Sequence, residues 1–257
     1  MSRYDAMFRR SGNADIFGAF VMLGDPDLES CAAILDQLVA GGADMIEVGI
    51  PFSDPIADGP VIQAAAVRAL ANGTTPADCF ALLESFRARH PDVPVGILTY
   101  ANLVLARGRD AFYARAAEAG VDSVLVADVP VLEAAPYAEA ARAQGVAPVL
   151  IAAANTPAPR LREIAGLGGG YTYCVARAGV TGADQAAQFD HQAMLDGLRA
   201  AGAPPPIFGF GISRPAQVRA ALAAGAAGAI SGSAIVERVA RGEDVTAFVR
   251  EMKAATL

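Results

Sequence analysis

The feature of this chain that most constrains its fold is a repeated order of helical segment, glycine and short apolar strand. The segment LVAGG at 38–42 precedes the apolar run MIEVG at 45–49. Further helical segments end at Gly120, Gly145, Gly202 and Gly225, and each is followed by an apolar run. Glycine just past a helix is typical of a C-cap, because it adopts a positive φ without a steric penalty. Strands that alternate with helices predict βαβ units and a parallel sheet.

The number of these units predicts the architecture. The apolar runs that we expect as strands lie near residues 16–23, 45–49, 94–99, 123–128, 147–151, 170–175, 206–210 and 227–231. Helical stretches lie between them, with additions at 2–11 and within 60–90. Eight units in this length predict a (β/α)8 TIM barrel with an extra N-terminal helix, formed as one domain by residues 1–257. A doubly wound open sheet is the main competitor, although it usually has fewer strands.

Composition excludes several classes of function. Hydrophobic residues make up 54% of the chain and charged residues 18%, which favours a large core on both faces of a sheet. The net charge of −7 gives no electrostatic reason to bind nucleic acid or anionic lipid. The first ten residues are too charged for a signal peptide, and no apolar run is long enough to span a bilayer. We therefore expect a soluble, cytoplasmic protein.

Residue types that often carry catalysis are scarce. The only lysine is Lys253, and the only histidines, His90 and His191, lack a partner at metal-ligand spacing and are expected at the surface. This scarcity argues against a Schiff-base aldolase, which needs a lysine inside the barrel, and against a metal aldolase. Three cysteines are far apart in the chain and are expected as small buried residues: Cys31, Cys79 and Cys174.

The candidate catalytic groups are one carboxylate within the strand at 45–49 and another in the loop that follows it. Alternation along this strand places Ile46 and Val48 on the helix-covered face and Glu47 inside the barrel. A carboxyl group buried there should have a raised pKa and become an acid usable near neutral pH. Asp58 lies in the loop above the barrel mouth, where we expect a wet surrounding and an ionised carboxylate. The alternatives are a structural glutamate paired with a base, and an aspartate that only forms the turn before Gly59.

Glycine-rich turns follow the last two expected strands, at 209–213 (GFGIS) and 231–235 (SGSAI). Barrels often form a phosphate site at this place from backbone N–H groups and a helix N-terminus. Ser233 is expected to cap the helix that follows the second turn. The loop 176–185 is long and rich in small residues, which suits a mobile lid. Ordinary loop chemistry, and an insertion without function, are the simpler interpretations of these two features.

The run IPFSDPIADGP at residues 50–60 resembles the tryptophan synthase α chain family. Further matching runs are FVMLGDP at 20–26, YANLV at 100–104, DSVLVADVP at 122–130, GYTY at 170–173, GVTG at 179–182, GFGIS at 209–213 and AAGAISGSA at 226–234. Nearly the whole chain is covered in the family's order. The sequence departs from the family pattern at Met22, Ala176 and Ala178.

This resemblance implies retro-aldol cleavage of indole-3-glycerol phosphate to indole and glyceraldehyde 3-phosphate, with no cofactor or metal in this chain. It implies that Glu47 is the acid/base at indole C3 and that Asp58 accepts a hydrogen bond from the indole N–H. Thr181 matches the lid residue that meets this aspartate. Positions that match the indole pocket are Phe20, Leu98, Ile151 and Tyr173. Positions that match the phosphate cradle are Gly182, Gly211, Gly232 and Ser233.

The resemblance also implies a partner. In this family a β chain carries pyridoxal phosphate and receives indole through a tunnel, usually in an α2β2 heterotetramer. Residues 54–56 match part of the contact loop, so partner binding is expected to reposition Asp58. Three alternatives stay open: a non-catalytic subunit that activates the β chain, a stand-alone indole-3-glycerol phosphate lyase, and another barrel enzyme acting on a phosphorylated sugar.

Overall fold

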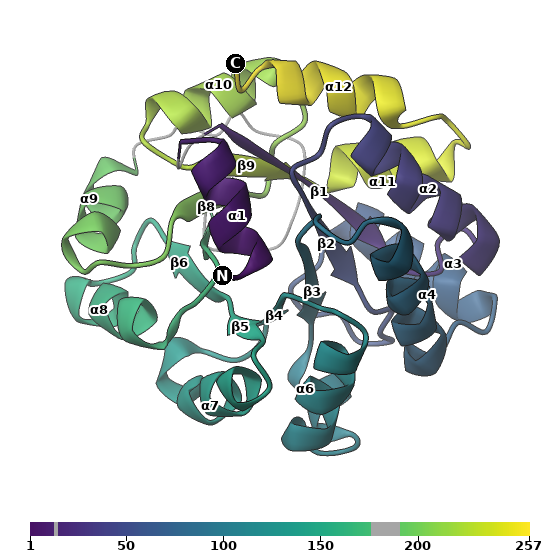
Figure 1. Cartoon of the computed structure of the whole chain (residues 1–257), viewed down its shortest axis with the longest axis horizontal. Coiled ribbons are helices and arrows are strands. Elements are labelled where there is room, and N and C mark those ends of the chain that lie inside the picture. Colours follow the sequence, from purple (N-terminus) through teal and green to yellow (C-terminus); the bar gives the residue numbers. More distant parts are fainter. Residues whose placement is uncertain (13–14, 176–190) are drawn as a thin grey trace.

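The computed structural model describes residues 1–12, 15–175 and 191–257. Its strands form one parallel sheet in the order β5-β4-β3-β2-β1-β9-β8-β7-β6, which curls into a ring (Figure 1). The strands are β1 (Ile16–Met22), β2 (Met45–Gly49), β3 (Val95–Thr99), β4 (Ser123–Val126), β5 (Ala147–Pro148), β6 (Leu150–Ala153), β7 (Thr172–Val175), β8 (Pro206–Gly209) and β9 (Gly228–Ser231).

The ring contains eight strand positions, and one of them is interrupted. The strand expected near 147–151 consists of two pieces, β5 and β6, separated by Val149. β5 pairs with β4, while β6 pairs with β7 at the other edge of the sheet. The Val149 N–H still donates to the Val124 carbonyl oxygen at 3.0 Å. The nearly closed parallel ring confirms the expected (β/α)8 class.

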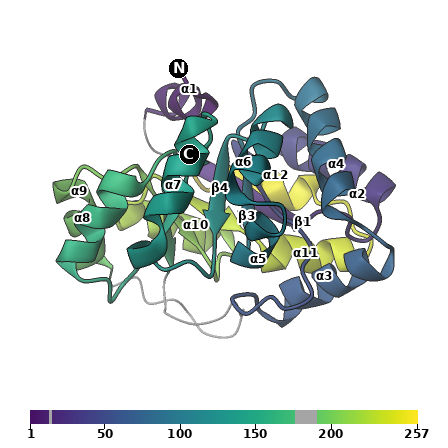
Figure 2. The ribbon, with the colours of Figure 1, turned by 90° about the horizontal axis from the view of Figure 1, so that it is seen from below.

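Helices surround the ring and connect successive strands (Figures 1 and 2). They are α1 (Arg3–Arg10), α2 (Leu28–Ala40), α3 (Pro60–Ala71), α4 (Pro76–Arg89), α5 (Ala101–Leu105), α6 (Arg109–Glu118), η1 (Val131–Glu133), α7 (Ala135–Ala143), α8 (Ala158–Leu167), α9 (Gln192–Ala200), α10 (Pro215–Ala223), α11 (Ser233–Ala240) and α12 (Thr246–Ala254). The predicted glycine stops have positive φ, for example 96° at Gly42 and 74° at Gly120. No helix in the described part of the chain combines the length and apolar content that a bilayer crossing requires.

The apolar core has two layers, one on each side of the ring. On β2, Ile46 and Val48 belong to the outer layer between sheet and helices, whereas Met45 belongs to the inner layer. This alternation confirms the side assigned to each residue from the sequence. The cysteines are buried and unbonded to one another, as expected: Cys31, Cys79 and Cys174. His191 was expected at the surface, but it is buried and its ring lies 5.1 Å from that of Phe208.

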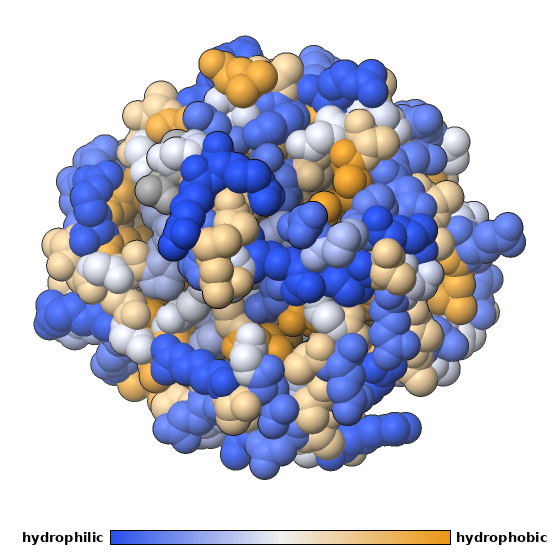
Figure 3. Space-filling view, in the orientation of Figure 1, coloured by the Kyte–Doolittle hydropathy of each residue, from blue (hydrophilic) through white to orange (hydrophobic). Residues whose placement is uncertain are grey.

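Helix α1 covers the end of the barrel at which the strands begin. Figure 2 shows α1 on one side of the ring and α3 on the other. The Tyr4 hydroxyl lies 2.8 Å from the Ser123 hydroxyl at the start of β4, and Arg3 forms an ion pair with Asp122 at 2.9 Å. On the outside of this face, hydrophilic side chains are interrupted by scattered apolar ones (Figure 3). The opposite end of the barrel is therefore the one left open for a site.

Candidate active site

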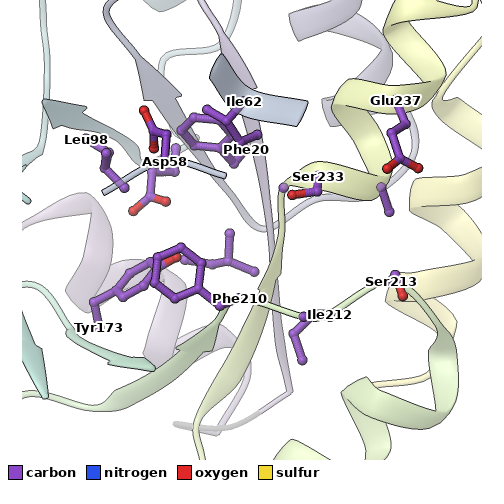
Figure 4. Close-up of a pocket in the computed structure, with 15 residues that line it drawn as sticks. Phe20, Asp58, Ile62, Leu98, Tyr173, Phe210, Ile212, Ser213, Ser233 and Glu237 are labelled. Atoms are coloured by element: carbon purple, nitrogen blue, oxygen red, sulfur yellow. The ribbon is translucent and has the colours of Figure 1, made fainter. Parts of the chain in front are cut away.

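A pocket of about 650 Å³ opens at the C-terminal ends of the strands. Figure 4 shows that the pocket has two unlike ends. Aromatic and aliphatic side chains gather around Asp58, whereas hydroxyl groups and a carboxylate lie toward α11. The lining residues are Phe20, Glu47, Asp58, Ile62, Leu98, Tyr173, Phe210, Gly211, Ile212, Ser213, Ile230, Gly232, Ser233, Ala234 and Glu237.

Glu47 projects from the middle of β2 into the barrel and is 1% exposed. The Tyr171 hydroxyl donates a hydrogen bond of 2.6 Å to its Oε1 atom. Its Oε2 atom is buried and has no hydrogen-bond partner among the described residues. Burial raises the pKa of Glu47 to about 7, although the bond from Tyr171 opposes this rise. The partner is a phenol rather than a base, so the geometry does not favour the structural ion pair considered from the sequence.

Asp58 lies just before α3 and is 7% exposed, so the wet surrounding expected from the sequence is wrong. The Tyr100 hydroxyl hydrogen-bonds with the Asp58 side chain and accepts from the Ala57 N–H at 3.2 Å. The Tyr100 ring in turn stacks on Phe52 at 5.4 Å between centroids. Burial raises the pKa of Asp58, and the hydrogen bond with Tyr100 counteracts this shift. The carboxyl groups of Glu47 and Asp58 are therefore both largely shielded from water.

The apolar end of the pocket contains three of the four predicted indole-pocket residues: Phe20, Leu98 and Tyr173. The fourth, Ile151, does not line this pocket but borders a neighbouring hollow with residues 127–131. Phe210 meets Tyr173 edge to face at 5.7 Å. Sequence reasoning missed Ile62 and Ile230 as lining residues, and it placed Phe210 only within the predicted phosphate turn at 209–213. Ile230 had a usable signal, since strand alternation places it on the inner face of β9.

The other end of the pocket is formed by the two glycine-rich turns. Gly211, Gly232 and Ser233 line it as predicted, and Gly211 has a φ of 74° that favours glycine. Gly232, rather than Ser233, occupies the N-cap of α11, and no side chain caps this helix. The expected capping function of Ser233 is therefore wrong. Ser213, which belongs to the predicted turn at 209–213, and Glu237, which was missed, also line this end.

The predicted lid lies outside the described residues. This includes two predicted site residues, Thr181 and Gly182, and the departures at 176 and 178. Met22, the remaining departure, is buried at the end of β1, and a Cβ on Gly49 would lie 2.9 Å from its sulfur. Among the residues that the structure describes, no group of three or more His, Cys, Asp or Glu side chains is arranged to hold a metal ion.

Comparison with known proteins identifies the family. The family model described as tryptophan synthase alpha chain matches residues 8–256. The chain belongs to the tryptophan synthase α chain family. It is 54% identical to the tryptophan synthase alpha chain of Shewanella amazonensis over 100% of both chains. It is 53% identical to that of Cronobacter sakazakii, over 100% of this chain and 99% of the relative.

Solved structures of tryptophan synthase share the fold. A Mycobacterium tuberculosis tryptophan synthase structure matches with a TM-score of 0.89 and 29% identity, over 99% of this chain and 98% of that chain. A structure of the mutually activating tryptophan synthase a2b2 complex of Pyrococcus furiosus matches with a TM-score of 0.83 and 34% identity, over 95% and 98%. These findings confirm the family expected from the sequence, and with it the indole-3-glycerol phosphate lyase class.

Proposed function

We propose that Glu47 and Asp58 of this chain carry the cleavage of indole-3-glycerol phosphate into indole and glyceraldehyde 3-phosphate. The observation that carries the proposal is that two buried carboxyl groups line the same pocket. One end of this pocket is apolar, and the other is formed by the backbone of the two glycine-rich turns. An indole ring fits the apolar end, and a phosphate fits the turns at 209–213 and 231–235. The proposal treats residues 1–257 as one barrel domain.

The first step of the proposed reaction is a proton transfer. With its pKa near 7, Glu47 is protonated in a substantial fraction of molecules at neutral pH. Its Oε2 atom has no partner among the described residues, which leaves it available to donate a proton to indole C3. The ring then becomes a cationic indolenine. Asp58, as a carboxylate, accepts a hydrogen bond from the ring N–H and stabilises this positive charge.

The second step breaks the carbon–carbon bond. The Glu47 carboxylate left by the first step accepts the proton of the hydroxyl group on the glycerol carbon bonded to C3. That oxygen forms the aldehyde as the bond to C3 breaks, and the electron pair returns to the indolenine ring. Indole and glyceraldehyde 3-phosphate result, and Glu47 is protonated again. The protonated ring is the electron sink, so the step uses groups of the substrate and two side chains only.

The phosphate is proposed to bind at the turns that contain Gly211 and Gly232. Backbone N–H groups and the N-terminus of α11 offer partial positive charge to an anion. Position 211 has a left-handed backbone, which favours glycine, whereas a Cβ at position 232 would make only an ordinary van der Waals contact with the Phe20 ring at 3.5 Å. The anion would thus be anchored while the indole lies near Glu47.

We further propose that this chain binds a tryptophan synthase β chain in an α2β2 heterotetramer, the assembly named for the Pyrococcus furiosus complex. Pyridoxal phosphate chemistry would belong to that partner. Ile56, in the contact loop expected at 54–56, is 72% exposed, which suits an interface residue. The stand-alone lyase and the non-catalytic subunit are the alternatives. The cytoplasmic location stays a prediction.

The decisive experiment replaces Glu47 with Gln and measures indole release with and without added β chain. We expect a loss of at least ~10²-fold in both conditions, since a positioned acid/base group contributes about that much. Glu251→Gln, an exposed position on α12, is the matched control and should keep parental activity. Unchanged indole release in Glu47→Gln would exclude the proposed proton donor. Full parental activity without the β chain would favour the stand-alone lyase.

Thermal unfolding at pH 8 shows whether the loss comes from misfolding. Burial raises the folded-state pKa of Glu47 from 4.5 to about 7, so the folded state holds this proton more tightly than the unfolded chain. Stability therefore falls as pH rises between these values, by about 3 kcal/mol, and the loss persists above them. Glutamine carries no charge to bury. The inactive variant should unfold at or above the parental temperature.

A further inference from the structure

Among the residues that the structure describes, the ionisable side chains that line the pocket are all acidic. Three carboxyl groups line it, those of Glu47, Asp58 and Glu237, and none of the lining residues that the structure describes is Lys or Arg. Glu47 and Asp58 lie at the apolar end, where the proposed proton transfer takes place. Glu237 lies at the other end, together with Ser233 and Ser213 (Figure 4). The proposed chemistry gives Glu237 no function.

The position of Glu237 follows from the geometry of α11. It comes four residues after Ser233, about one helical turn, so both side chains lie on the same face of the helix. Glu237 is partly buried, and no ion pair or side-chain hydrogen bond joins it to another described residue. Arg241, one helical turn further on, interacts electrostatically with Glu237, but its direct ion pair, at 2.5 Å, is with Glu243. Within the described part of the chain, the Glu237 carboxyl group therefore borders the pocket without a direct ion pair.

A carboxylate at this place opposes the ligand that the turns attract. Backbone N–H groups and a helix N-terminus supply only partial positive charges, whereas a phosphate monoester carries close to two negative charges at neutral pH. A neighbouring carboxylate raises the free energy of the bound anion, and it does so more strongly in a partly buried pocket than in bulk water. The affinity of this end of the pocket for a phosphate therefore depends on two opposing effects: attraction by the backbone N–H groups and the helix N-terminus, and repulsion by the Glu237 carboxylate.

We propose that Glu237 sets the affinity of the phosphate end: it weakens binding of the phosphorylated substrate and speeds release of the phosphorylated product. This inference rests on the proposed function, since that function places the phosphate at the turns beside α11. Two consequences separate it from a steric effect. The contribution of Glu237 depends on ligand charge, so it vanishes for the same substrate without its phosphate. It also decreases with added salt, because ions screen a partly exposed carboxylate.

The test compares Glu237→Gln with the parent and with Glu251→Gln, which makes the same charge change at an exposed site on α12. We expect KM for indole-3-glycerol phosphate to fall about three- to tenfold at low salt, the size expected for one partly screened unit charge. Inhibition by glyceraldehyde 3-phosphate should strengthen by a similar factor. Calorimetric titration with inorganic phosphate should show the same gain in affinity. The substrate without its phosphate should bind the parent and Glu237→Gln with equal affinity.

Three outcomes would overturn the inference: an unchanged or raised KM in Glu237→Gln, an equal gain for the unphosphorylated substrate, or a gain that is the same at low and high salt. An equal gain in Glu251→Gln would assign the effect to net charge and would overturn it as well. Failure of the proposed function has a different result. The parent protein would then release no indole, while inorganic phosphate binding would still respond to Glu237→Gln.

Discussion

The two oxygens of the Glu47 carboxyl group have different surroundings. Oε1 accepts the hydrogen bond from Tyr171, whereas Oε2 is buried without a hydrogen-bond partner in the described part of the chain. Tyr171 is itself packed against Tyr4, with 5.6 Å between ring centroids. One oxygen is thus fixed by a rigid aromatic neighbour. The other, which has no partner among the described residues, is the proposed proton donor, so the side chain would enter the reaction already oriented.

Tyr171→Phe should move the pH dependence of the reaction. The hydrogen bond from Tyr171 stabilises the carboxylate and so opposes the effect of burial on the Glu47 pKa. Without it the pKa rises further above about 7, and the acid form persists to higher pH. We expect the alkaline limb of the kcat/KM profile to shift to higher pH. Tyr113→Phe, at a buried tyrosine of α6, is the control and should leave the limb in place.

An alkaline limb that stays in place in Tyr171→Phe would contradict the assignment of this limb to Glu47. A merely structural function of Tyr171 would lower activity at every pH without moving the limb, so the profile separates the two explanations. The measurement uses kcat/KM because that ratio reports the ionisation of the free enzyme.

For single residues, the sequence predicted those properties that depend on residues nearby in the chain. The period of two along β2 was sufficient to place Glu47 inside the barrel and to anticipate its raised pKa. The surroundings of Asp58 depend instead on Tyr100, 42 residues later in the chain, and that contact has no local signature. Glu237 was missed for the same reason. Glu237 is one of several charged residues near the end of the chain, and only the closed barrel brings it to the pocket.

At the scale of elements, aspartates tie neighbouring strands together where the strands begin. Asp44, just before β2, accepts the Phe17 N–H of β1 at 2.7 Å and pairs with Lys253 at 2.8 Å. Asp122, just before β4, accepts the Val95 N–H of β3 at 2.8 Å. The only lysine of the chain therefore belongs to a structural contact, which agrees with its exclusion as a catalytic residue.

Asp122→Ala should destabilise the fold strongly. Asp122 pairs with Arg3 and with Arg87, whose side chain is only 13% exposed. Removal of the carboxylate leaves Arg87 largely buried without its charge partner, and breaking such a pair costs about 3 kcal/mol or more. Asp36→Ala removes contacts of a half-exposed carboxylate with Arg89 and His90 and should cost about 1 kcal/mol or less. Urea unfolding measures both changes. Equal losses in the two variants would contradict this account.

The elements themselves were largely predictable because glycine marks where helices end. Positive φ at Gly145, Gly202 and Gly225 confirms three such ends. The interruption between β5 and β6 was not predicted, although Pro148 in the apolar run 147–151 lacks a backbone N–H for strand pairing. Its two halves pair with different neighbours, β4 and β7, and only the closed ring determines where the pairing changes.

At the scale of the whole molecule, stability and chemistry are concentrated at opposite ends of the barrel. Helix α1 and the Asp122 ion pairs close the end where strands begin, while the pocket opens where they end (Figure 2). This division is general for (β/α)8 barrels. It allows the loop 50–60 to serve the site and a proposed partner at once, because movement there leaves the closed end intact.

The loop 50–60 joins an exposed residue to a buried one. Ile56 is 72% exposed and lies two residues before Asp58, which is buried. A partner that covers Ile56 would restrict the loop and so fix Asp58, which couples partner binding to turnover. Ile56→Asp places a charge in the proposed interface and should weaken β-chain binding. Stimulation of indole release by the β chain should then need at least ~10-fold more β chain, since desolvating an unpaired charge at an interface is costly.

The control is Val67→Asp, which adds the same charge at a 64% exposed position on α3. Co-purification and a titration of indole release against β chain measure the difference. Basal indole release in Ile56→Asp should change far less than the stimulated rate, because the Tyr100 contact still holds Asp58 in the isolated chain. Undiminished stimulation would show that the loop does not form the interface. The coupling between partner and aspartate would then have to pass through another face of the barrel.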